Sequence, residues 1–469
     1  MTLALQQLAS TGPLRQGAPH FVHDGRQTIR LPRHVRRGHV CLNALVGIDL
    51  GTSNSAVGVV DKAVARIVQT SDGSTTSSLV AFTEDKILIG SEARRQAHDN
   101  PQNTFSSVKR LIGTGFETSL AELQYAPFKA QPGPNGGTLL CCPARGAVYT
   151  PQEVSSHIVR HLISHAGEEL GSPICDAVIT VPAHFNERQR AATAEAGALA
   201  GLQRVRLLQE PVAAVIAYGL GKETEDQLVL VVDLGGGTYD VSLVECFEGC
   251  LEVIATTGDA RLGGDDWNRA FMQWVLQQAP EDASCASAGD MQDLLRAVES
   301  AKQRLSERDQ TSISVPDFGG SRGLDVPVTR RDFEEATAPL LSRLWPPLKE
   351  LGSQACVAWA SRPDEGDEDI AHSQDTDRPR STAPADKFLP QPRRISHVAL
   401  VGGATRMPSV QTFISRLTCL PLQVTVDPAL CVALGATIYG GMLEGTIPGC
   451  IELADGAYSA ALHDRYTGF

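Results

Sequence analysis

The sequence predicts an α/β fold, and three strand-to-turn junctions support that prediction. The first junction reads LVGIDLGTSNSAVGVV over residues 45–60, and the second reads LVLVVDLGGGTYDVSLVE over residues 228–245. In each, an apolar strand ends in Asp-Leu-Gly, small residues form a turn, and a second strand follows. The third junction, HVALVGGATRMPSV over residues 397–410, places two glycines after another apolar strand.

Taken singly, such a turn is also typical of an ordinary β-hairpin. Their repetition indicates a ligand site instead. Glycine turns let backbone amides crowd around an anion, and a strand-end aspartate can hold a hydrated cation. The first two junctions therefore predict two half-sites that close on one polyphosphate.

Composition narrows the class of protein. The chain has 469 residues, of which 42% are hydrophobic, enough for two or more cores. Its net charge of −13 argues against a nucleic-acid partner held by phosphate neutralisation. No apolar run is long enough to predict a membrane span. Eleven cysteines without a CxxC pair are expected to be mostly buried free thiols in a reducing compartment.

Residues 1–44 form a basic leader in which Asp24 is the single acid. Its arginines are Arg15, Arg26, Arg30, Arg33, Arg36 and Arg37. This pattern is typical of a mitochondrial or plastid transit peptide, although a disordered cytosolic extension or a misassigned start codon would look alike. The protein is accordingly expected to be intracellular and soluble, either in the cytoplasm or in one of those organelles.

Residues 150–170 predict a helix, with Thr150 as N-cap and a proline in the first turn. His157, His161 and His165 recur on one face of it, a spacing that can hold a metal. No nearby motif supplies a further ligand, so a solvated or half-buried helix face is favoured.

Residues 175–202 predict a buried strand, a Val-Pro stop, an Asn-capped turn and an alanine-rich helix. The next segment, RVRLLQEPVAAVIAYGL, places Glu210 at a strand end and Pro211 at the start of another helix. That carboxylate is expected to point into the cleft that the glycine turns line. The alternative is an acid that merely interacts with the helix dipole.

Together these motifs resemble the nucleotide-binding domain of the 70-kDa heat-shock chaperones, in the superfamily that also contains actin and the sugar kinases. The matching segments, in order, are GIDLGTSNS, SSVKRLIG, VITVPAHFNERQRAAT, LLQEPVAAVIAYG, VVDLGGGTYDVSL, LGGDDWN, AKQRLS and VALVGGATRMP. The resemblance implies an actin-like ATPase fold, with two lobes of related α/β, mixed-sheet subdomains around a nucleotide cleft. Lobe I would span residues 45–226 and lobe II residues 227–443.

The resemblance also implies a ligand, ATP or ADP with Mg²⁺, and K⁺ as a further candidate ion. Asp49 and Asp233 would hold the magnesium through water. Lys109 matches the catalytic lysine, while Glu210 and Asp233 match carboxylates that orient the attacking water. The phosphates would lie against Gly51, Thr52, Ser53, Gly235, Gly236, Gly237 and Thr238.

Adenosine recognition is expected from lobe II. The residues that match its binding positions are Glu299, Lys302, Ser306, Gly402, Gly403 and Arg406. Two positions depart from the family pattern, since Gln303 replaces an arginine that stacks on adenine and Ala429 replaces an acid. Pro182 and Arg190 match positions that relay the nucleotide state.

Two segments fall outside the matching motifs. Residues 352–394 are rich in Asp, Glu, Pro and Ser and are expected to form a disordered, solvent-exposed insertion, or alternatively a partner-binding segment. Residues 444–469 form a short tail, too short for an independent core, so no peptide-binding domain is expected. The tail either adds a strand to lobe II or is loose.

Three functions compete on this evidence. The favoured one is an ATP-binding, slowly hydrolysing chaperone-family protein, with J-domain co-chaperones and nucleotide-exchange factors as candidate partners and neither nucleic acid nor membrane. Gln303 and Ala429 leave open a nucleotide-binding regulator with little turnover. A small-molecule kinase of the same superfamily is third, because the segment around Glu210 is of the chaperone type. Neither a GxxxxGKS or GxxxxGKT loop nor a GxGxxG turn is present.

Overall fold

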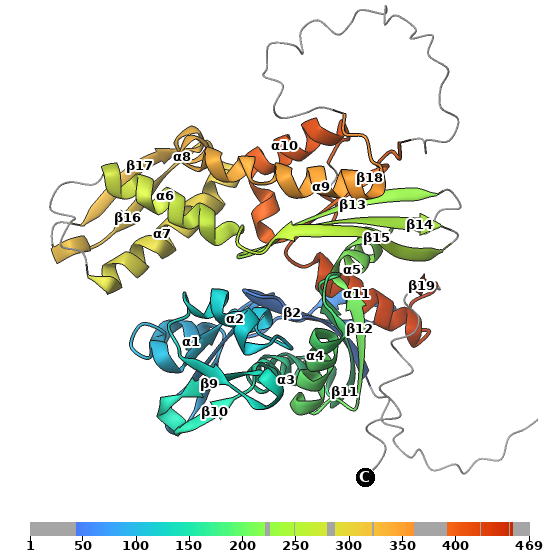
Figure 1. Ribbon diagram of the computed structural model, residues 1–469, viewed down its shortest axis with the longest axis horizontal. Coiled ribbons are helices and arrows are strands. Elements are labelled where there is room, and N and C mark those ends of the chain that lie inside the picture. The colour runs from blue at the N-terminus through green and yellow to red at the C-terminus, as the bar shows by residue number, and fades with distance from the viewer. Residues whose placement is uncertain are drawn as a thin grey trace, which may run out of the picture. The chain divides into compact units, whose positions relative to one another are not determined.

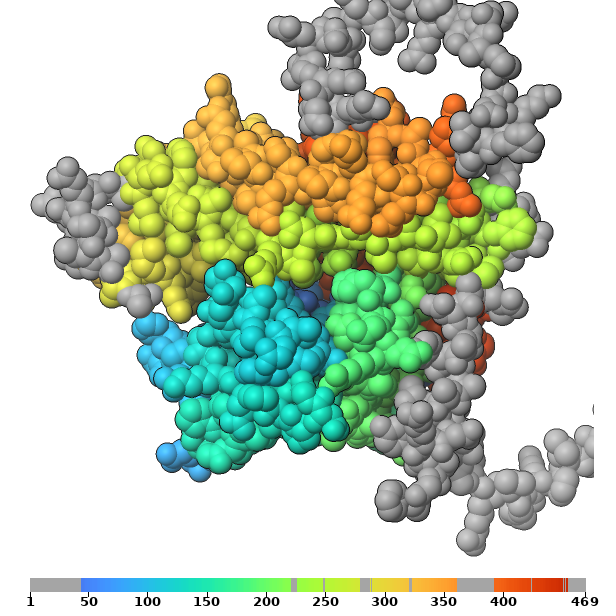
Figure 2. Space-filling view, in the orientation of Figure 1, coloured from blue at the N-terminus to red at the C-terminus, as the bar shows by residue number. Residues whose placement is uncertain are grey.

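Two mixed β-sheets, one from each half of the chain, organise the protein (Figure 1). The computed structural model describes residues 44–220, 226–247, 249–278, 287–320, 323–360, 392–422, 424–449 and 451–453, and all structural statements below concern these residues. The basic leader lies outside them, apart from residue 44. In Figure 2 the two halves meet along a boundary, cyan and green on one side and lime and orange on the other.

The first sheet has the order β12-β11-β1-β2-β3, with β4 paired to β2. β1 runs parallel to β11 and antiparallel to β2, and its central residues are buried. Such continuous Val- and Ile-rich strands suit a sheet that is covered on both faces. Its strands are β1 (Ala44–Asp49), β2 (Asn54–Asp61), β3 (Val64–Ile67), β4 (Thr76–Ser77), β11 (Ile174–Val181) and β12 (Arg204–Gln209).

The second sheet repeats this pattern in the order β18-β13-β14-β15-β19. β13 runs antiparallel to β14 and parallel to β18, as β1 does to β2 and β11. Each Asp-Leu-Gly junction therefore joins two antiparallel strands at the centre of a sheet. The strands are β13 (Gln227–Leu234), β14 (Tyr239–Phe247), β15 (Cys250–Asp259), β18 (His397–Val401) and β19 (Glu452–Leu453).

Smaller sheets and short 3-10 helices complete the two lobes. The smaller sheets are β6-β5-β7 and β10-β9-β8 in lobe I and β16-β17 in lobe II. Their strands are β5 (Leu79–Phe82), β6 (Ile87–Ile89), β7 (Thr104–Ser106), β8 (Ala130–Pro132), β9 (Thr138–Cys142), β10 (Ala147–Tyr149), β16 (Gln310–Val315) and β17 (Leu324–Thr329). The 3-10 helices are η1 (Pro101–Asn103), η2 (Val108–Arg110), η3 (Pro134–Gly136), η4 (Pro143–Arg145), η6 (Phe318–Gly320) and η7 (Gly403–Arg406).

Several helices begin at a residue whose side chain caps the helix. Thr150 and Asn186 each form a capping box, at the starts of α3 and α4, as their sequences predict. The helices are α1 (Ser91–Gln96), α2 (Phe116–Leu123), α3 (Pro151–Leu170), α4 (Glu187–Ala200), α5 (Glu210–Ala217), α6 (Gly264–Gln278), α7 (Ala288–Glu307), α8 (Arg330–Ser342), α9 (Trp345–Ala355), α10 (Pro408–Thr418) and α11 (Cys431–Leu443). No helix of the described ranges is long and apolar enough to cross a membrane.

Helix α11 lies on the other side of the boundary between the lobes that the sequence predicts. Although it ends at Leu443, it packs on the first sheet and on α5, between the two sheets in Figure 1. The approach is close because the facing residues are glycines: a Cβ on Gly435 would lie 1.8 Å from the Ala213 carbonyl oxygen. The predicted lobe II therefore returns to lobe I over residues 431–443, and α5 and α11 share one hydrophobic cluster with both sheets.

The expected insertion and tail are partly described. α9 extends to Ala355, and Val357 is buried and bridges to Arg393, so residues 352–357 belong to lobe II rather than to an exposed insertion. Residues 361–391 lie outside the described residues. The tail adds β19, which pairs in parallel with β15.

The eight described cysteines are free thiols, as expected, but the expectation that most are buried is wrong for these. Cys142, Cys246 and Cys431 are buried, whereas the others are intermediate or exposed.

Candidate functional site

The two Asp-Leu-Gly turns face each other across a cavity of about 330 Å³. Asp49 ends β1 and Asp233 lies next to the end of β13. The turns approach so closely that a Cβ on Gly236 would lie 2.6 Å from Ser53 Oγ. Residues from both turns line the cavity: Asp49, Gly51, Thr52, Ser53, Asp233, Gly235, Gly236, Gly237 and Thr238.

A lysine and a glutamate from distant segments meet in this cavity. Lys109 lies in η2, and Glu210 is the first residue of α5, where Pro211 fixes the helix start. Lys109 Nζ donates a hydrogen bond to Glu210 Oε1, and only 9% and 13% of the two side chains are exposed. Glu210 therefore points into the cleft, as predicted, and pairs with the predicted catalytic lysine.

The charges around this pair are unbalanced. Burial opposes the charge of Lys109, but Glu210, Asp49 and Asp233 outweigh that effect and raise its pKa. Burial, reinforced by Glu210 and only partly opposed by Lys109, raises the pKa of Asp49 to about 7. Burial and the neighbouring carboxylates raise the pKa of Asp233 well above its usual range. The site thus concentrates more negative charge than its lysine compensates.

This donor set fits a hydrated divalent cation. Carboxylate oxygens on opposite turns are ligands that Mg²⁺ prefers, and Mg²⁺ keeps several waters while it binds one or two carboxylates and substrate phosphates. Across the described ranges, no three His, Cys, Asp or Glu side chains are grouped to hold a metal directly. Asp49 and Asp233 face the cavity from opposite turns, and the positive charge of such an ion would relieve the repulsion between them.

The adenosine side of the predicted site is only partly present around the cavity. Gly402, Gly403 and Ala429 line it, and Gly402 has φ 82°, with its Cβ position 2.2 Å from the Leu234 carbonyl oxygen. That spacing requires glycine. Arg406 is not part of the lining and forms an ion pair with Asp427.

The three predicted residues of α7 also lie outside the lining of the cavity, which does not include Glu299, Lys302 or Ser306. Lys302 is buried, and its Nζ donates to the Gly264 carbonyl oxygen at 2.9 Å. Gly264 N in turn donates to the Gly235 carbonyl oxygen at 2.9 Å. Lys302 is therefore linked to the second phosphate turn, while Gln303 beside it is exposed.

The two predicted relay residues, Pro182 and Arg190, are both linked to Phe185 in one loop. Pro182 lines the cavity, and its carbonyl oxygen accepts from Phe185 N at 3.2 Å. Arg190, on α4, donates through Nε to the Phe185 carbonyl oxygen at 2.9 Å. Arg190 thus braces the loop that carries Pro182 without entering the cavity.

A protein-family model matches most of the chain. The model described as Hsp70 protein matches residues 45–361 and 375–455. The chain belongs to the Hsp70 family. This membership carries with it the actin-like ATPase fold predicted from the motifs, and the two related sheets agree with it.

Curated Hsp70 relatives are considerably longer than this chain. Chaperone protein DnaK of Thermus thermophilus is 38% identical over 412 residues, which are 86% of this chain and 61% of the relative. Heat shock 70 kDa protein 7, chloroplastic, of Arabidopsis thaliana is 36% identical over 453 residues, 94% of this chain and 58% of the relative. The chain thus spans about three fifths of the length of these relatives.

Arg110, His184 and Asp240 are among the polar lining residues that the sequence did not single out. Arg110 follows Lys109 and donates to the Gly237 carbonyl oxygen at 2.6 Å. Asp240 pairs with Asp233 in the β-ladder, and His184 Nδ1 lies 3.5 Å from its Oδ1. Burial, partly opposed by His184, raises the pKa of Asp240 to about 6. The hairpin register could have identified Asp240, because it places the two aspartates opposite each other.

The histidines of α3 behave as a packed helix face. The His157 ring contacts Phe82 edge-on, and the His161 and His165 rings lie 4.4 Å apart. Burial lowers the pKa of His157 and His161. These contacts agree with the half-buried helix face favoured from the sequence.

Proposed function

We propose that the protein binds Mg²⁺ with ATP between its lobes and hydrolyses ATP slowly, as an Hsp70-family ATPase. The observation that carries the proposal is the buried pair of Lys109 and Glu210 at the junction of two opposed glycine turns. Membership of the Hsp70 family supports nucleotide binding by this cleft.

Each polar group has a role in this mechanism. Backbone amides of Gly51 and of residues 235–237 would hold the phosphates, with the hydroxyls of Ser53 and Thr238 beside them. Lys109 would stabilise charge that develops on the γ-phosphoryl oxygens, since phosphoryl transfer depends on positioning and electrostatics.

Glu210 and Asp233 would orient the attacking water, and one of these two carboxylates would accept its proton. An ion held through water by Asp49 and Asp233 would neutralise part of the phosphate charge. K⁺ is a second candidate ion for the same carboxylate-rich site, whose described acids include Asp240.

Two alternatives depend on specific residues. Ala429 lines the cleft, and exposed Gln303 leaves adenine without an arginine to stack on, which favours a nucleotide-binding regulator with little turnover. A small-molecule kinase is less favoured, because the segment around Glu210 is of the chaperone type.

The test is a single-turnover ATP assay on the full chain, with calorimetric ATP binding and Lys109→Ala as the control. Slow hydrolysis that falls about 10²- to 10³-fold in Lys109→Ala, with binding retained, supports the ATPase. Tight binding without turnover would leave the regulator. No binding by folded protein would refute both.

A role in protein folding, with J-domain co-chaperones and nucleotide-exchange factors as partners, is the corresponding cellular proposal. It is supported by the chaperone names of the relatives. The chloroplastic relative and the basic leader together support a plastid location, with mitochondrion and cytoplasm as the other candidates.

A further inference from the structure

A second cavity adjoins the nucleotide cleft. Its volume is about 590 Å³, larger than the cleft itself, and its walls come from α2 and the following loop in lobe I and from α6 in lobe II. Arg110, Glu122 and Gly237 line both cavities. At its outer rim Tyr125 and Arg269 are largely exposed. The side cavity thus extends from the phosphate turn to the surface.

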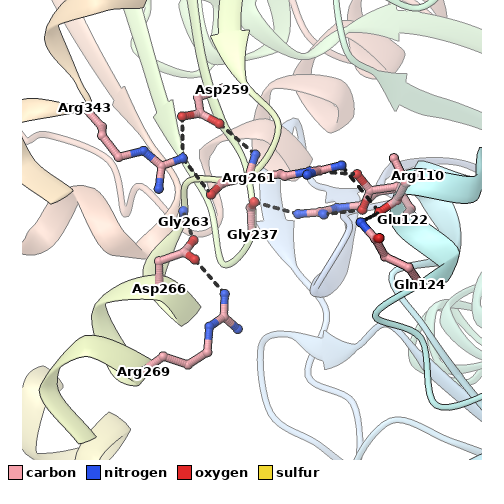
Figure 3. A network of polar contacts seen from close by, with 11 residues as sticks. Arg110, Glu122, Gln124, Gly237, Asp259, Arg261, Gly263, Asp266, Arg269 and Arg343 are labelled. Atoms are coloured by element: carbon pink, nitrogen blue, oxygen red, sulfur yellow. Dashed lines mark hydrogen bonds and ion pairs between the residues drawn. The ribbon is translucent and has the colours of Figure 1, made fainter. Parts of the chain in front are cut away.

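Charged contacts join the lobes (Figure 3) at residues that line both cavities. Arg110 donates to Glu122 Oε2 at 2.7 Å and to the Gly237 carbonyl oxygen at 2.6 Å. Arg261 of lobe II lies 3.7 Å from the other Glu122 oxygen and 5.9 Å from the centre of the Tyr125 ring. We call Arg110, Glu122 and Arg261 the clasp.

On lobe II, Asp259 and Arg343 anchor the clasp through the backbone of Arg261. Arg343 donates to Asp259 Oδ2 at 2.6 Å and to the Arg261 carbonyl oxygen at 3.0 Å, and Asp259 also accepts from Arg261 N. In Figure 3 these groups hold the backbone of Arg261 while its side chain reaches toward Glu122. Across the cleft, the half-exposed side chain of Arg261 makes this ion pair and a 3.4 Å hydrogen bond to the Ala121 carbonyl oxygen. Both contacts can open at modest cost.

A donor at the junction has no acceptor. Arg110 Nε is buried and makes no hydrogen bond within the described residues, although both of its terminal nitrogens are bonded. Buried donors are normally satisfied, and a guanidinium suits the oxygens of a phosphate particularly well. The unpaired donor therefore marks the point where an oxyanion would pass from one cavity to the other.

We infer that the side cavity is the exit route for orthophosphate after ATP cleavage and that the clasp is its gate. The inference rests on the proposed function. Phosphate formed at the glycine turns would leave past Arg110, Arg261 and then Arg269, while ADP stays held by both lobes. These arginines give the anion successive partners along the way, and paired acids keep each from holding it tightly.

The experiment measures phosphate release from full-length protein preloaded with Mg²⁺, ADP and inorganic phosphate. A fluorescent phosphate-binding reporter follows phosphate, and a fluorescent ADP analogue follows ADP. Cleavage is not needed, so failure of this test differs from failure of ATP hydrolysis.

Two substitutions should act in opposite directions. Arg261→Gln removes the cross-cleft ion pair and should speed phosphate release about two- to fivefold, the effect of losing one half-exposed ion pair. Ala126→Trp fills the half-buried wall of the side cavity and should slow it. Neither should change ADP release. Glu335→Gln, which breaks an exposed ion pair on α8, is the matched control.

Three results would overturn the inference. Equal acceleration of phosphate and ADP in Arg261→Gln would mean that the clasp only holds the lobes together. Unchanged phosphate release in Ala126→Trp would place the exit elsewhere. Immediate loss of phosphate from wild-type protein that still holds ADP would mean that no gate retards phosphate release.

Discussion

Replacing Gly236 by alanine probes the meeting of the two phosphate turns. The added Cβ would lie 2.6 Å from Ser53 Oγ and 2.9 Å from Ser53 Cβ, far inside van der Waals contact. Because both atoms belong to a short side chain, the strain can be relieved only if the two turns separate. Overpacking of this kind costs about 1–3 kcal/mol, which corresponds to roughly a 5- to 150-fold loss of affinity for a ligand that needs both turns.

The assay is calorimetric titration of ATP in excess Mg²⁺ for wild type, Gly236→Ala, Ser53→Gly and the double variant. Ser53→Gly removes both clashing atoms, so the double variant should bind more tightly than Gly236→Ala, with a coupling energy of about 1–2 kcal/mol. Gly289→Ala, in α7, controls for the added methyl group, since its Cβ would lie 3.5 Å from Ser287 Oγ, an ordinary van der Waals contact. Wild-type affinity in Gly236→Ala, or no recovery in the double variant, would refute the reasoning.

Two further predictions concern stability. Gly435→Ala should lower the free energy of unfolding by about 2 kcal/mol in denaturant titration, because its Cβ overlaps the Ala213 carbonyl oxygen, and wild-type stability would contradict the packing of α11 on α5. In protein free of metal and nucleotide, the pKa of Asp49 is raised by burial to about 7, above its value in the unfolded chain. The stability it contributes is complete below about pH 4 and is lost as pH rises through 7, so unfolding between pH 6 and pH 8 should become about 1.4 kcal/mol easier. Asp49→Asn should reduce that dependence, and an equal dependence in both proteins would contradict it.

Much of the fold could be predicted because its signals are local. The Asp-Leu-Gly turns, the Thr150 and Asn186 caps and the Glu-Pro helix start each depend on a few neighbouring residues, and the structure has all of them. The repetition of strand and turn predicted two half-sites, and the family resemblance implied two related lobes. Family resemblance added the pairing of Lys109 with the turns, which no local pattern specifies.

The rest depends on contacts between distant segments. Helix α11 packs on lobe I, where Gly435 faces α5. The sequence of α11 does not show which helix its glycines will contact. Likewise Arg110, Glu122 and Arg261 are ordinary charged residues in sequence, and only the approach of the lobes brings them together. For Lys302 the position on a helix was predictable, whereas its hydrogen bond to Gly264 was not.

The most direct test of the central claim is a crystal structure of the full chain with Mg²⁺ and a non-hydrolysable ATP analogue. The account predicts phosphates between residues 51–53 and residues 235–237, with the ion bound through water to Asp49 and Asp233 and the γ-phosphate beside Lys109. A nucleotide bound elsewhere, or an ion that contacts neither aspartate, would contradict it.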